Sequence, residues 1–329
     1  MAQLNVAVVG AGLAGLACAR TLADHGIAVA IFDKGRSPGG RATSRREPGG
    51  RTFDHGAQFF TAREAWLTER VAAWEAEGVV ARWSPAGRVR TEESWWVGVP
   101  DMGAVARRLA QGLDVHLARR VEAIARSEAG WSLTVAGDSP GAPADHLAEA
   151  VVLAVPATQC AALLAPGSEL AREVSAVVQT PCWCVMLALR GGARLAADLF
   201  EDREGPIAWA AREGSKPGRS TVNVDGEERW TLHASTPWSE AHLEDSRESV
   251  RDVLSTMFLA QHGLGAADVV HANAHRWRYA RGRATTPVSA ARTDARLVVC
   301  GDWLEGARVE SALASGVAAA ARILAEATR

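Results

Sequence analysis

A glycine-rich turn between two apolar stretches is the feature of this sequence that most limits its fold. Residues 10–15 read GAGLAG, with the spacing G-x-G-x-x-G; they follow the apolar residues 4–9 and open the small-residue segment 13–24. The first glycine permits a tight turn, the second lets the backbone approach a pyrophosphate, and the third lets a helix pack on a strand. The next apolar stretch, 27–32, ends at Asp33, whose carboxylate is placed to accept ribose hydroxyls. The pattern predicts a β-α-β unit that binds a dinucleotide at a helix N-terminus.

Length and composition set the broad class of protein. The chain has 329 residues, of which 48% are hydrophobic, and 38 acidic residues against 36 basic ones leave a net charge of −2. These values predict a folded chain of two domains, and the lack of a basic excess argues against nucleic acid or a membrane as a partner. The five cysteines form no C-x-x-C pair and the chain starts with no signal peptide, so we expect buried thiols and a cytoplasmic location.

Apolar periodicity predicts the remaining elements and a discontinuous first domain. Helices are expected at 63–78, 102–112, 243–262 and from 306 to 325, and strands at 121–124, 131–135, 150–155, 182–189, 230–233, 276–279 and 297–301. Apolar runs typical of a parallel sheet lie near both ends of the chain. The predicted fold class is therefore α/β, with a Rossmann-like dinucleotide-binding domain and a second, mixed-sheet substrate domain. The first comprises residues 1–57, 101–156 and 293–329, and the second comprises residues 58–100 and 157–292.

Two further segments favour FAD over NAD as the dinucleotide. A glycine doublet and an arginine at 39–41 follow Asp33 closely enough to lie along a pyrophosphate, with the arginine as counter-charge. The Gly-Asp pair at 301–302 ends the last apolar strand, and the helix after Gly306 is expected to aim its N-terminus at the same place. A cofactor contacted from both ends of the chain is long, and the sequence has no second G-x-G-x-x-G motif for a separate nicotinamide domain.

These motifs together resemble the FAD-dependent amine oxidase superfamily, and within it the bacterial renalase-like flavoproteins. The closer resemblance rests on FDHGAQFFTAR at 53–63, HRWRYAR at 275–281, CGDW at 300–303, GARVE at 306–310, and the shorter stretches 96–98, 215–217 and 230–234. It implies a p-hydroxybenzoate-hydroxylase-like architecture with amine oxidase topology and noncovalent FAD. It also implies oxidation of 2- or 6-dihydro isomers of NAD(P) to NAD(P)+ by hydride transfer to flavin N5, with O2 reduced to H2O2. The sequence departs from the family pattern at Asp101 and Gly282, where glycine and proline are common.

The motifs and the resemblance assign residues to the cofactor. FAD is expected to contact Gly10, Gly12, Leu13, Ala14, Gly15, Asp33, Lys34, Gly40, Arg41, Ala42, Ala57, Gln58, Phe59, Val121, Gly301, Asp302, Arg308 and Val309. Hydride arrival puts negative charge on the N1–C2=O edge of the flavin, and the backbone N–H of Val309 is the expected closest donor to that edge. Arg308 either adds a charge there or points to solvent.

Four residues are assigned to substrate oxidation. Gln58 and Phe59 are expected to line the flavin near N5, with Trp277 and Tyr279 closing the pocket over the substrate. Strand alternation puts Trp277 and Tyr279 on one face, where they can sandwich a flat ring; the alternative is an aromatic core face with arginines in solvent. His233 is either a substrate-pocket residue or a core histidine. The nine histidines show no metal-ligand spacing, so we expect no metal.

The positively charged residues of one predicted loop, and the small number of lysines in the chain, help to choose between possible substrates. Arg212, Lys216 and Arg219 lie on a predicted loop and either receive the pyrophosphate of a dinucleotide substrate or form a solvated surface loop. Lys34 and Lys216 are the only lysines of the chain. Typical amine oxidases of the superfamily hold a lysine that anchors a water at flavin N5, and neither lysine looks suited to that role. A dihydronicotinamide gains aromaticity when it gives up hydride, so its oxidation needs little acid–base help.

Three functions are therefore weighed. The first is an oxidase of dihydronicotinamide dinucleotides that uses O2, the second is a flavin-containing amine oxidase, and the third is a flavin-binding protein without turnover. The third is disfavoured because a carrier has no need of the substrate domain.

We predict that Asp33→Ala weakens FAD binding, because the variant loses a charge-assisted acceptor worth roughly 1.5–3 kcal/mol. The purified variant should lose its yellow colour, and titration of the apoprotein with FAD measures the loss of affinity. Binding of FAD at wild-type affinity would show that Asp33 does not hold the ribose.

Overall fold

The computed structural model describes residues 4–88, 92–128, 130–136, 144–190, 195–219, 226–283, 292–293 and 296–327. They form two compact units. Unit 1 comprises Met1–Gly40, Ala106–Gln179 and Arg281–Arg329, and unit 2 comprises Arg41–Val105 and Thr180–Ala280. The chain passes between the units at 40/41, 105/106, 179/180 and 280/281, whereas the predicted domain boundaries lie at 57/58, 100/101, 156/157 and 292/293.

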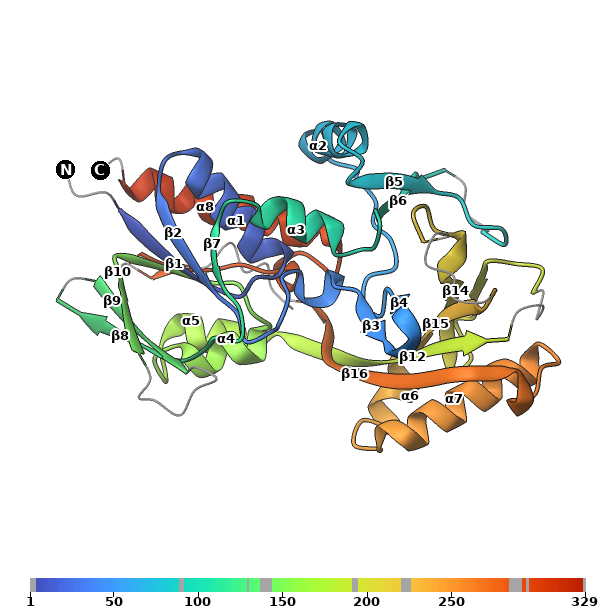
Figure 1. Ribbon diagram of the computed structural model, residues 1–329. Helices are drawn as coiled ribbons and strands as arrows, with labels where there is room; N and C mark the ends of the chain where they lie inside the picture. Colours follow the sequence, from blue (N-terminus) through green and yellow to red (C-terminus); the bar gives the residue numbers. More distant parts are fainter. Residues whose placement is uncertain are drawn as a thin grey trace. The chain divides into compact units, whose positions relative to one another are not determined.

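The elements of the described chain are labelled in Figure 1. The helices are α1 (Leu13–Asp24), α2 (Ala65–Ala76), α3 (Ala104–Ala110), α4 (Ala157–Leu163), α5 (Glu169–Ser175), α6 (Thr236–Ala241), α7 (Arg247–Gln261) and α8 (Val309–Ala327). The strands up to residue 153 are β1 (Asn5–Val9), β2 (Ala28–Phe32), β3 (Arg45–Glu47), β4 (Arg51–Phe53), β5 (Val80–Trp83), β6 (Trp95–Gly98), β7 (Asp114–His116), β8 (Arg120–Ser127), β9 (Gly130–Ala136), β10 (Ala144–Ala148) and β11 (Ala150–Leu153). The later strands are β12 (Val178–Leu189), β13 (Leu199–Glu201), β14 (Ile207–Arg212), β15 (Glu228–Ala234), β16 (Val269–Arg283), β17 (Arg292–Thr293) and β18 (Leu297–Val299).

Unit 1 is built on a six-stranded sheet in the order β17-β18-β11-β1-β2-β7. The neighbours from β18 to β7 pair in parallel, and β17 joins β18 antiparallel. The chain enters this sheet through β1, α1 and β2 in succession. The α/β fold class and the initial β-α-β unit predicted from the sequence are thus confirmed.

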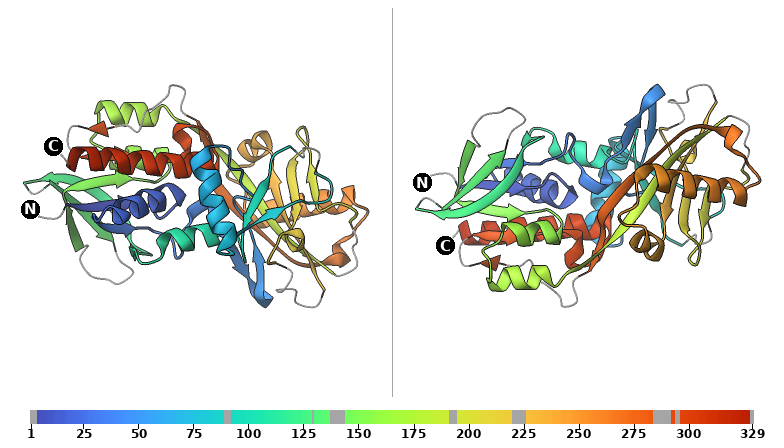
Figure 2. Two further views of the ribbon diagram at one scale, coloured as in Figure 1. Left: turned by 90° about the horizontal axis from the view of Figure 1, so that it is seen from above. Right: turned by 90° about the horizontal axis from the view of Figure 1, so that it is seen from below.

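Different layers cover the two faces of this sheet (Figures 1 and 2). On one face, Ala7 and Val9 of β1 share a buried cluster with Trp131 and Leu133 of β9 and with apolar residues of α4 and α5, including Val174. On the other, α1 and α8 lie side by side, with α1 in contact with β1 and β2 and α8 in contact with β18. The central strands are buried on both sides, which explains their continuous apolar sequences.

Glycine allows the closest approaches in this unit. A Cβ atom at Gly15 would lie 2.0 Å from the carbonyl oxygen of Gly10, so α1 starts directly against the turn that follows β1. A Cβ atom at Gly316 of α8 would lie 2.1 Å from the carbonyl oxygen of Ala14. The backbones of α1 and α8 touch there without intervening side chains.

Unit 2 is built on a five-stranded sheet in the order β13-β14-β15-β12-β16. The pairs β13–β14, β14–β15 and β12–β15 are antiparallel. One face buries Trp183 of β12 against Phe258 of α7 in the larger apolar cluster of this unit. On the other face Cys184 lies with Phe53 in a small cluster, and Trp277 packs against it. Trp277, which is predicted to meet the substrate, thus lies on this second face.

Most predicted elements are present, and the observed elements that were not predicted are short. Helices α2, α3, α7 and α8 confirm the predicted helices with small differences at their ends. Helices α4 and α5, each of seven residues, were not predicted, because two turns are too few to show a helical period. The hairpin β3–β4 was not among the predicted elements either. None of the described helices is long and apolar enough to cross a membrane.

The two departures from the family pattern have local reasons. Asp101 accepts hydrogen bonds from Gly103 N at 2.9 Å through its side chain and from Ala104 N at 3.0 Å through its carbonyl oxygen, so it supports the start of α3. A Cβ atom at Gly282 would lie 2.8 Å from the Cβ of Trp303, so a larger residue would collide with that side chain.

The five cysteines are buried, as predicted, and none forms a disulfide. Burial raises the pKa of the Cys18 and Cys160 thiols to about 12. These thiols stay protonated at neutral pH and are packing residues rather than nucleophiles.

We predict that Gly316→Ala lowers the free energy of unfolding by roughly 1–3 kcal/mol, because the added methyl group overpacks the contact between α8 and α1. Gly214→Ala is the matched control, since a Cβ atom there meets no atom within 4 Å. Denaturant unfolding of both variants measures the difference. Equal stability of the two variants would contradict the close packing of the helices.

Candidate functional site

In unit 1 the predicted dinucleotide turn is open where a phosphate is expected. Gly12 is the N-cap of α1, no side chain caps it, and the first intrahelical bond runs from Leu16 N to Gly12 O at 2.9 Å. A Cβ atom at Gly12 would meet no other atom within 4 Å, whereas one at Gly10, where φ is +111°, would lie 2.6 Å from the carbonyl oxygen of Ala154. The helix therefore presents free N–H groups and its positive end to open space, which suits a phosphate.

Asp33 and the glycine doublet border the same turn. The Asp33 carboxylate accepts hydrogen bonds from Ala11 N and from Gly35 N, both at 2.6 Å. Gly39 N donates to Ala11 O at 2.7 Å, and Gly40 lies beside Gly12, since a Cβ atom added at Gly40 would be in ordinary contact with the Gly12 Cα at 3.5 Å. The segment after the acidic residue thus folds back onto the glycine turn. Each Asp33 oxygen keeps a free lone pair for a ribose hydroxyl.

The end of the chain contributes a second helix N-terminus to unit 1. Gly301 N donates to Ser315 Oγ at 2.9 Å, and a 3-10 turn at Asp302–Leu304 follows. The helix α8 begins at Val309, and its first intrahelical bond runs from Ala312 N to Arg308 O at 3.1 Å. The N–H of Val309 thus precedes the hydrogen-bonded helix, the position predicted for a flavin donor. Arg308 is exposed.

The remaining predicted cofactor residues of unit 1 differ in exposure. Lys34 is exposed and donates to Gln159 Oε1 at 3.2 Å. Val121 is a buried residue of β8 at a register shift between β8 and β9. The open turn at Gly12, the acidic residue and the free helix ends form a donor and acceptor set that fits the phosphates and ribose of a dinucleotide.

In unit 2 the segment from Asp54 to Gln58 is held along its whole length. Ala57 N donates to Arg41 O at 2.8 Å, and a Cβ atom at Gly56 would lie 1.9 Å from the same oxygen. The indole N–H of Trp277 donates to the carbonyl oxygen of His55 at 2.8 Å. Arg41, predicted to meet the pyrophosphate, donates to the carbonyl oxygen of Ala280 at 2.9 Å. These contacts bring four predicted site residues, Arg41, Ala57, Gln58 and Trp277, to one segment.

Neutral imidazoles surround Trp277. The His55 ring lies 4.8 Å from the Trp277 ring and 5.0 Å from the His275 ring, measured between centroids. Burial, helped by His275 and Arg45, lowers the pKa of His55 to about 3. Burial, helped by Arg45, lowers the pKa of His275 to about 4. His233 Nε2 lies 3.3 Å from the carbonyl oxygen of His55, so this predicted residue belongs to the same cluster.

Lys216 and Arg219 are buried in ion pairs, so the alternative of a solvated surface loop is wrong for them. Lys216 Nζ lies 3.1 Å from both Asp54 Oδ2 and Glu213 Oε2, and Arg219 pairs with Asp54 at 2.5 Å. These four side chains are at most 3% exposed. Contact with a substrate pyrophosphate would require these pairs to break. The carboxylates lie 162 and 3 residues from Lys216 in sequence, and the longer separation hid the cluster from sequence analysis.

Arg212 also has partners within unit 2. Its guanidinium donates to the carbonyl oxygen of Ala197 at 3.1 Å and lies 3.5 Å from Asp198 and 3.8 Å from Glu228. Its positive charge is therefore balanced by carboxylates, and its role as a substrate ligand stays a prediction.

The aromatic residues predicted to meet the substrate have different surroundings. Phe59 stacks on Trp95 with ring centroids 3.9 Å apart and lies 5.5 Å from the Trp209 ring. Trp95 and Trp209 were not predicted as its neighbours, because contacts between side chains far apart in the sequence leave no local pattern. Tyr279 is half-buried. On the opposite side of β16, Arg276 and Arg278 pair with Glu244 at 3.0 and 2.8 Å, so the predicted alternation is confirmed.

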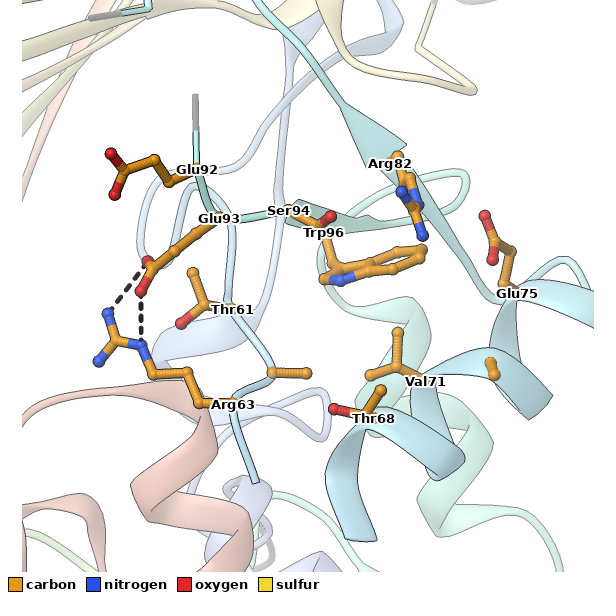
Figure 3. Close-up of a pocket in the computed structure, with 12 residues that line it drawn as sticks. Thr61, Arg63, Thr68, Val71, Glu75, Arg82, Glu92, Glu93, Ser94 and Trp96 are labelled. Atoms are coloured by element: carbon orange, nitrogen blue, oxygen red, sulfur yellow. Dashed lines mark hydrogen bonds and ion pairs between the residues drawn. The ribbon is translucent and has the colours of Figure 1, made fainter. Parts of the chain in front are cut away.

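A separate hollow of about 320 Å³ lies between α2, β5, β6 and residues 61–63 (Figure 3). Arg63 pairs with Glu93 at 2.8 Å on one side, and the Arg82 guanidinium lies 5.0 Å from the centre of the Trp96 ring. None of the predicted catalytic or substrate residues lines it. The residues predicted to act in catalysis and substrate binding thus lie elsewhere in unit 2. Among the described residues no group of three or more His, Cys, Asp or Glu side chains is arranged to hold a metal ion.

Family models match almost the whole length of the chain. Residues 8–72 match the model for an NAD(P)-binding Rossmann-like domain. Residues 88–324 match the model for flavin containing amine oxidoreductases.

Solved structures share the fold at low sequence identity. A putative protoporphyrinogen oxidase from Exiguobacterium sp. 255-15 is 15% identical with a TM-score of 0.77, over 99% of this chain and 100% of that one. Cyclohexylamine oxidase from Brevibacterium oxydans IH-35A is 14% identical with a TM-score of 0.77 over the same shares. A putrescine oxidase is 14% identical with a TM-score of 0.71, over 98% of this chain and 99% of that one. At these identities the matches establish the fold.

We predict that the imidazoles of His55 and His275 make the protein less stable in acid. Their pKa values are about 3 and about 4 in the folded chain and near 6.5 when unfolded, so the unfolded chain binds more protons between these values. Their contribution to stability is complete above about pH 6.5 and decreases as the pH falls toward 4.

The variant His55→Asn/His275→Asn tests this prediction. Its melting temperature should fall less than that of the wild type between about pH 7 and pH 5. The exposed His25, replaced by Asn, is the control and should leave the dependence unchanged. Equal acid sensitivity of the double variant and the wild type would contradict the conclusion that both imidazoles are neutral in the folded protein.

Proposed function

Because the chain belongs to the flavin-containing amine oxidoreductase family, we propose that it is an oxidase that takes hydride from 2- or 6-dihydro isomers of NAD(P). FAD is its cofactor, and when bound it supplies the acceptor of the hydride. The balanced reaction is dihydro-NAD(P) with O2 and one proton to NAD(P)+ and H2O2. The renalase-like sequence motifs and the side chains around Trp277 support this substrate over an amine.

The observation that carries the proposal is that none of the described residues beside Trp277 is an effective base. The pKa values of His55 and His275, about 3 and about 4, make these imidazoles far too weak to remove a proton from an alkylammonium ion at neutral pH. The buried carboxylates Asp54 and Glu213 are engaged by Lys216. A dihydronicotinamide carries no such proton and restores its aromaticity by losing hydride. Its oxidation therefore requires only that the protein hold it in position.

In this proposal each unit has a defined task. The glycine turn at Gly12 and the N-terminus of α8 bind the FAD phosphates and its N1–C2=O edge, and Asp33 binds the adenosine ribose. Trp277 and Tyr279 hold the flat nicotinamide ring by stacking. The ring of Trp277 is itself oriented by its hydrogen bond to His55.

We predict that 2- and 6-dihydro-NAD(P), mixed anaerobically with the purified protein, bleach its visible flavin absorbance in stopped flow. The ordinary 4-dihydro isomer is the matched control, because it differs only in the position of the hydride, and a panel of primary amines is the competing substrate class. Trp277→Leu should slow bleaching by on the order of 100-fold, since the ring is no longer positioned. Bleaching by amines would identify an amine oxidase instead, and bleaching by neither class would leave a flavin-binding protein without turnover.

A further inference from the structure

The ammonium group of Lys216 is saturated by three acceptors. It donates to Asp54 Oδ2, Gln58 Oε1 and Glu213 Oε2, each at 3.1 Å, and its side chain is 0% exposed. A lysine ammonium has three N–H donors, so all of them are used. Lys216 is thus a fixed cation rather than a base or an anion receptor.

The charges around Lys216 balance. Lys216 and Arg219 oppose the burial of Asp54 and hold its pKa well below its usual range. Burial raises the pKa of Glu213, but both of its oxygens accept hydrogen bonds, from Asp54 N and Thr231 Oγ1 on one and from Lys216 on the other. We assign the ionised form to Glu213, so two carboxylates face two cations.

The side-chain amide of Gln58 can take only one orientation in this cluster. Its oxygen accepts from Lys216, and its NH2 group donates to the carbonyl oxygen of Asp54, four residues earlier. The amide therefore ties the end of the segment 54–58 to its beginning. Because both the oxygen and the nitrogen of the amide have a partner, the Gln58 side chain is held in place.

We propose that Lys216 is a positioning residue that, through Gln58, sets the backbone shape of the segment 54–58. This backbone contains the His55 carbonyl oxygen that orients Trp277 and the Ala57 N–H that bonds to Arg41. The ammonium therefore sets the position of residues assigned to flavin and to substrate, although it contacts neither the flavin nor the substrate itself.

A competing explanation is that Lys216 serves only to balance charge. Lys216→Met leaves one unpaired negative charge in the cluster, which destabilises any buried site. The variant Lys216→Met/Glu213→Gln removes one charge of each sign, so the cluster stays neutral while Gln58 loses its donor. Gln58→Leu removes the same hydrogen bond without changing any charge.

Hydrogen exchange of the FAD-loaded protein without substrate distinguishes the two explanations. If Lys216 positions the segment, exchange of the Ala57 N–H rises roughly 10- to 100-fold in Gln58→Leu and in the charge-neutral double variant, as expected when a charge-assisted hydrogen bond is lost. The exchange of α7 should stay unchanged. Arg251→Met, which removes an exposed ion pair with Asp252, is the control and should leave Ala57 at the wild-type rate. Wild-type exchange at Ala57 in Gln58→Leu overturns the proposal, whatever the fate of the double variant.

The rate of flavin reduction is the second measurement, and this one rests on the proposed function. Gln58→Leu and the double variant should both be slowed about tenfold, and their combination no further, because they break the same contact. Restoration of the wild-type rate in the double variant would show that Lys216 only balances charge. Failure of dihydronicotinamides as substrates would leave the exchange experiment intact, so the two proposals fail independently.

Discussion

The arrangement of unit 2 depends on the hydrogen bonds and ion pairs of the buried Asp54 carboxylate. It accepts from Ser44 Oγ at 2.6 Å, Met102 N at 3.0 Å, Lys216 Nζ at 3.1 Å and Arg219 Nη2 at 2.5 Å. These donors come from three separate stretches of chain, around residues 44, 102 and 216–219. A charge taken out of water is tolerated only when it is fully paired. The segment 54–58 can therefore be placed correctly only when these stretches are folded around the Asp54 carboxylate.

Unit 1 depends instead on close contacts between backbone atoms, at positions where glycine has no side chain. Gly10, Gly15 and Gly316 bring backbone atoms together at distances that no Cβ atom permits, and Gly12 leaves open space at the start of α1. The same absence of side chains that packs α1 against its neighbours exposes the N–H groups that suit a phosphate. Packing and cofactor recognition in this unit thus have a single physical origin.

On the proposed function, unit 1 serves the cofactor and unit 2 serves the substrate. Unit 1 offers backbone donors and a carboxylate to a charged dinucleotide, whereas the face of unit 2 around Trp277 offers aromatic rings and neutral imidazoles. Neutral imidazoles with such low pKa values do not deprotonate an ammonium ion, whereas an aromatic ring stacks on a flat heterocycle. A family of flavin-containing oxidoreductases provides the common fold, and on this proposal the neutral face selects a substrate that needs no proton removed before hydride leaves.

The sequence by itself determined the dinucleotide turn, because its contacts are local. Ala11 N and the Asp33 carboxylate that binds it are 22 residues apart, within one β-α-β unit whose glycine spacing admits few other conformations. Only the tertiary structure decided what Lys216 and Arg219 do, since their partner Asp54 lies 162 and 165 residues away. A cation in a glycine- and proline-containing segment looks solvated until a distant carboxylate is brought beside it. Burial and pairing, which set the charge and the role of such groups, are properties of the fold and carry no local pattern.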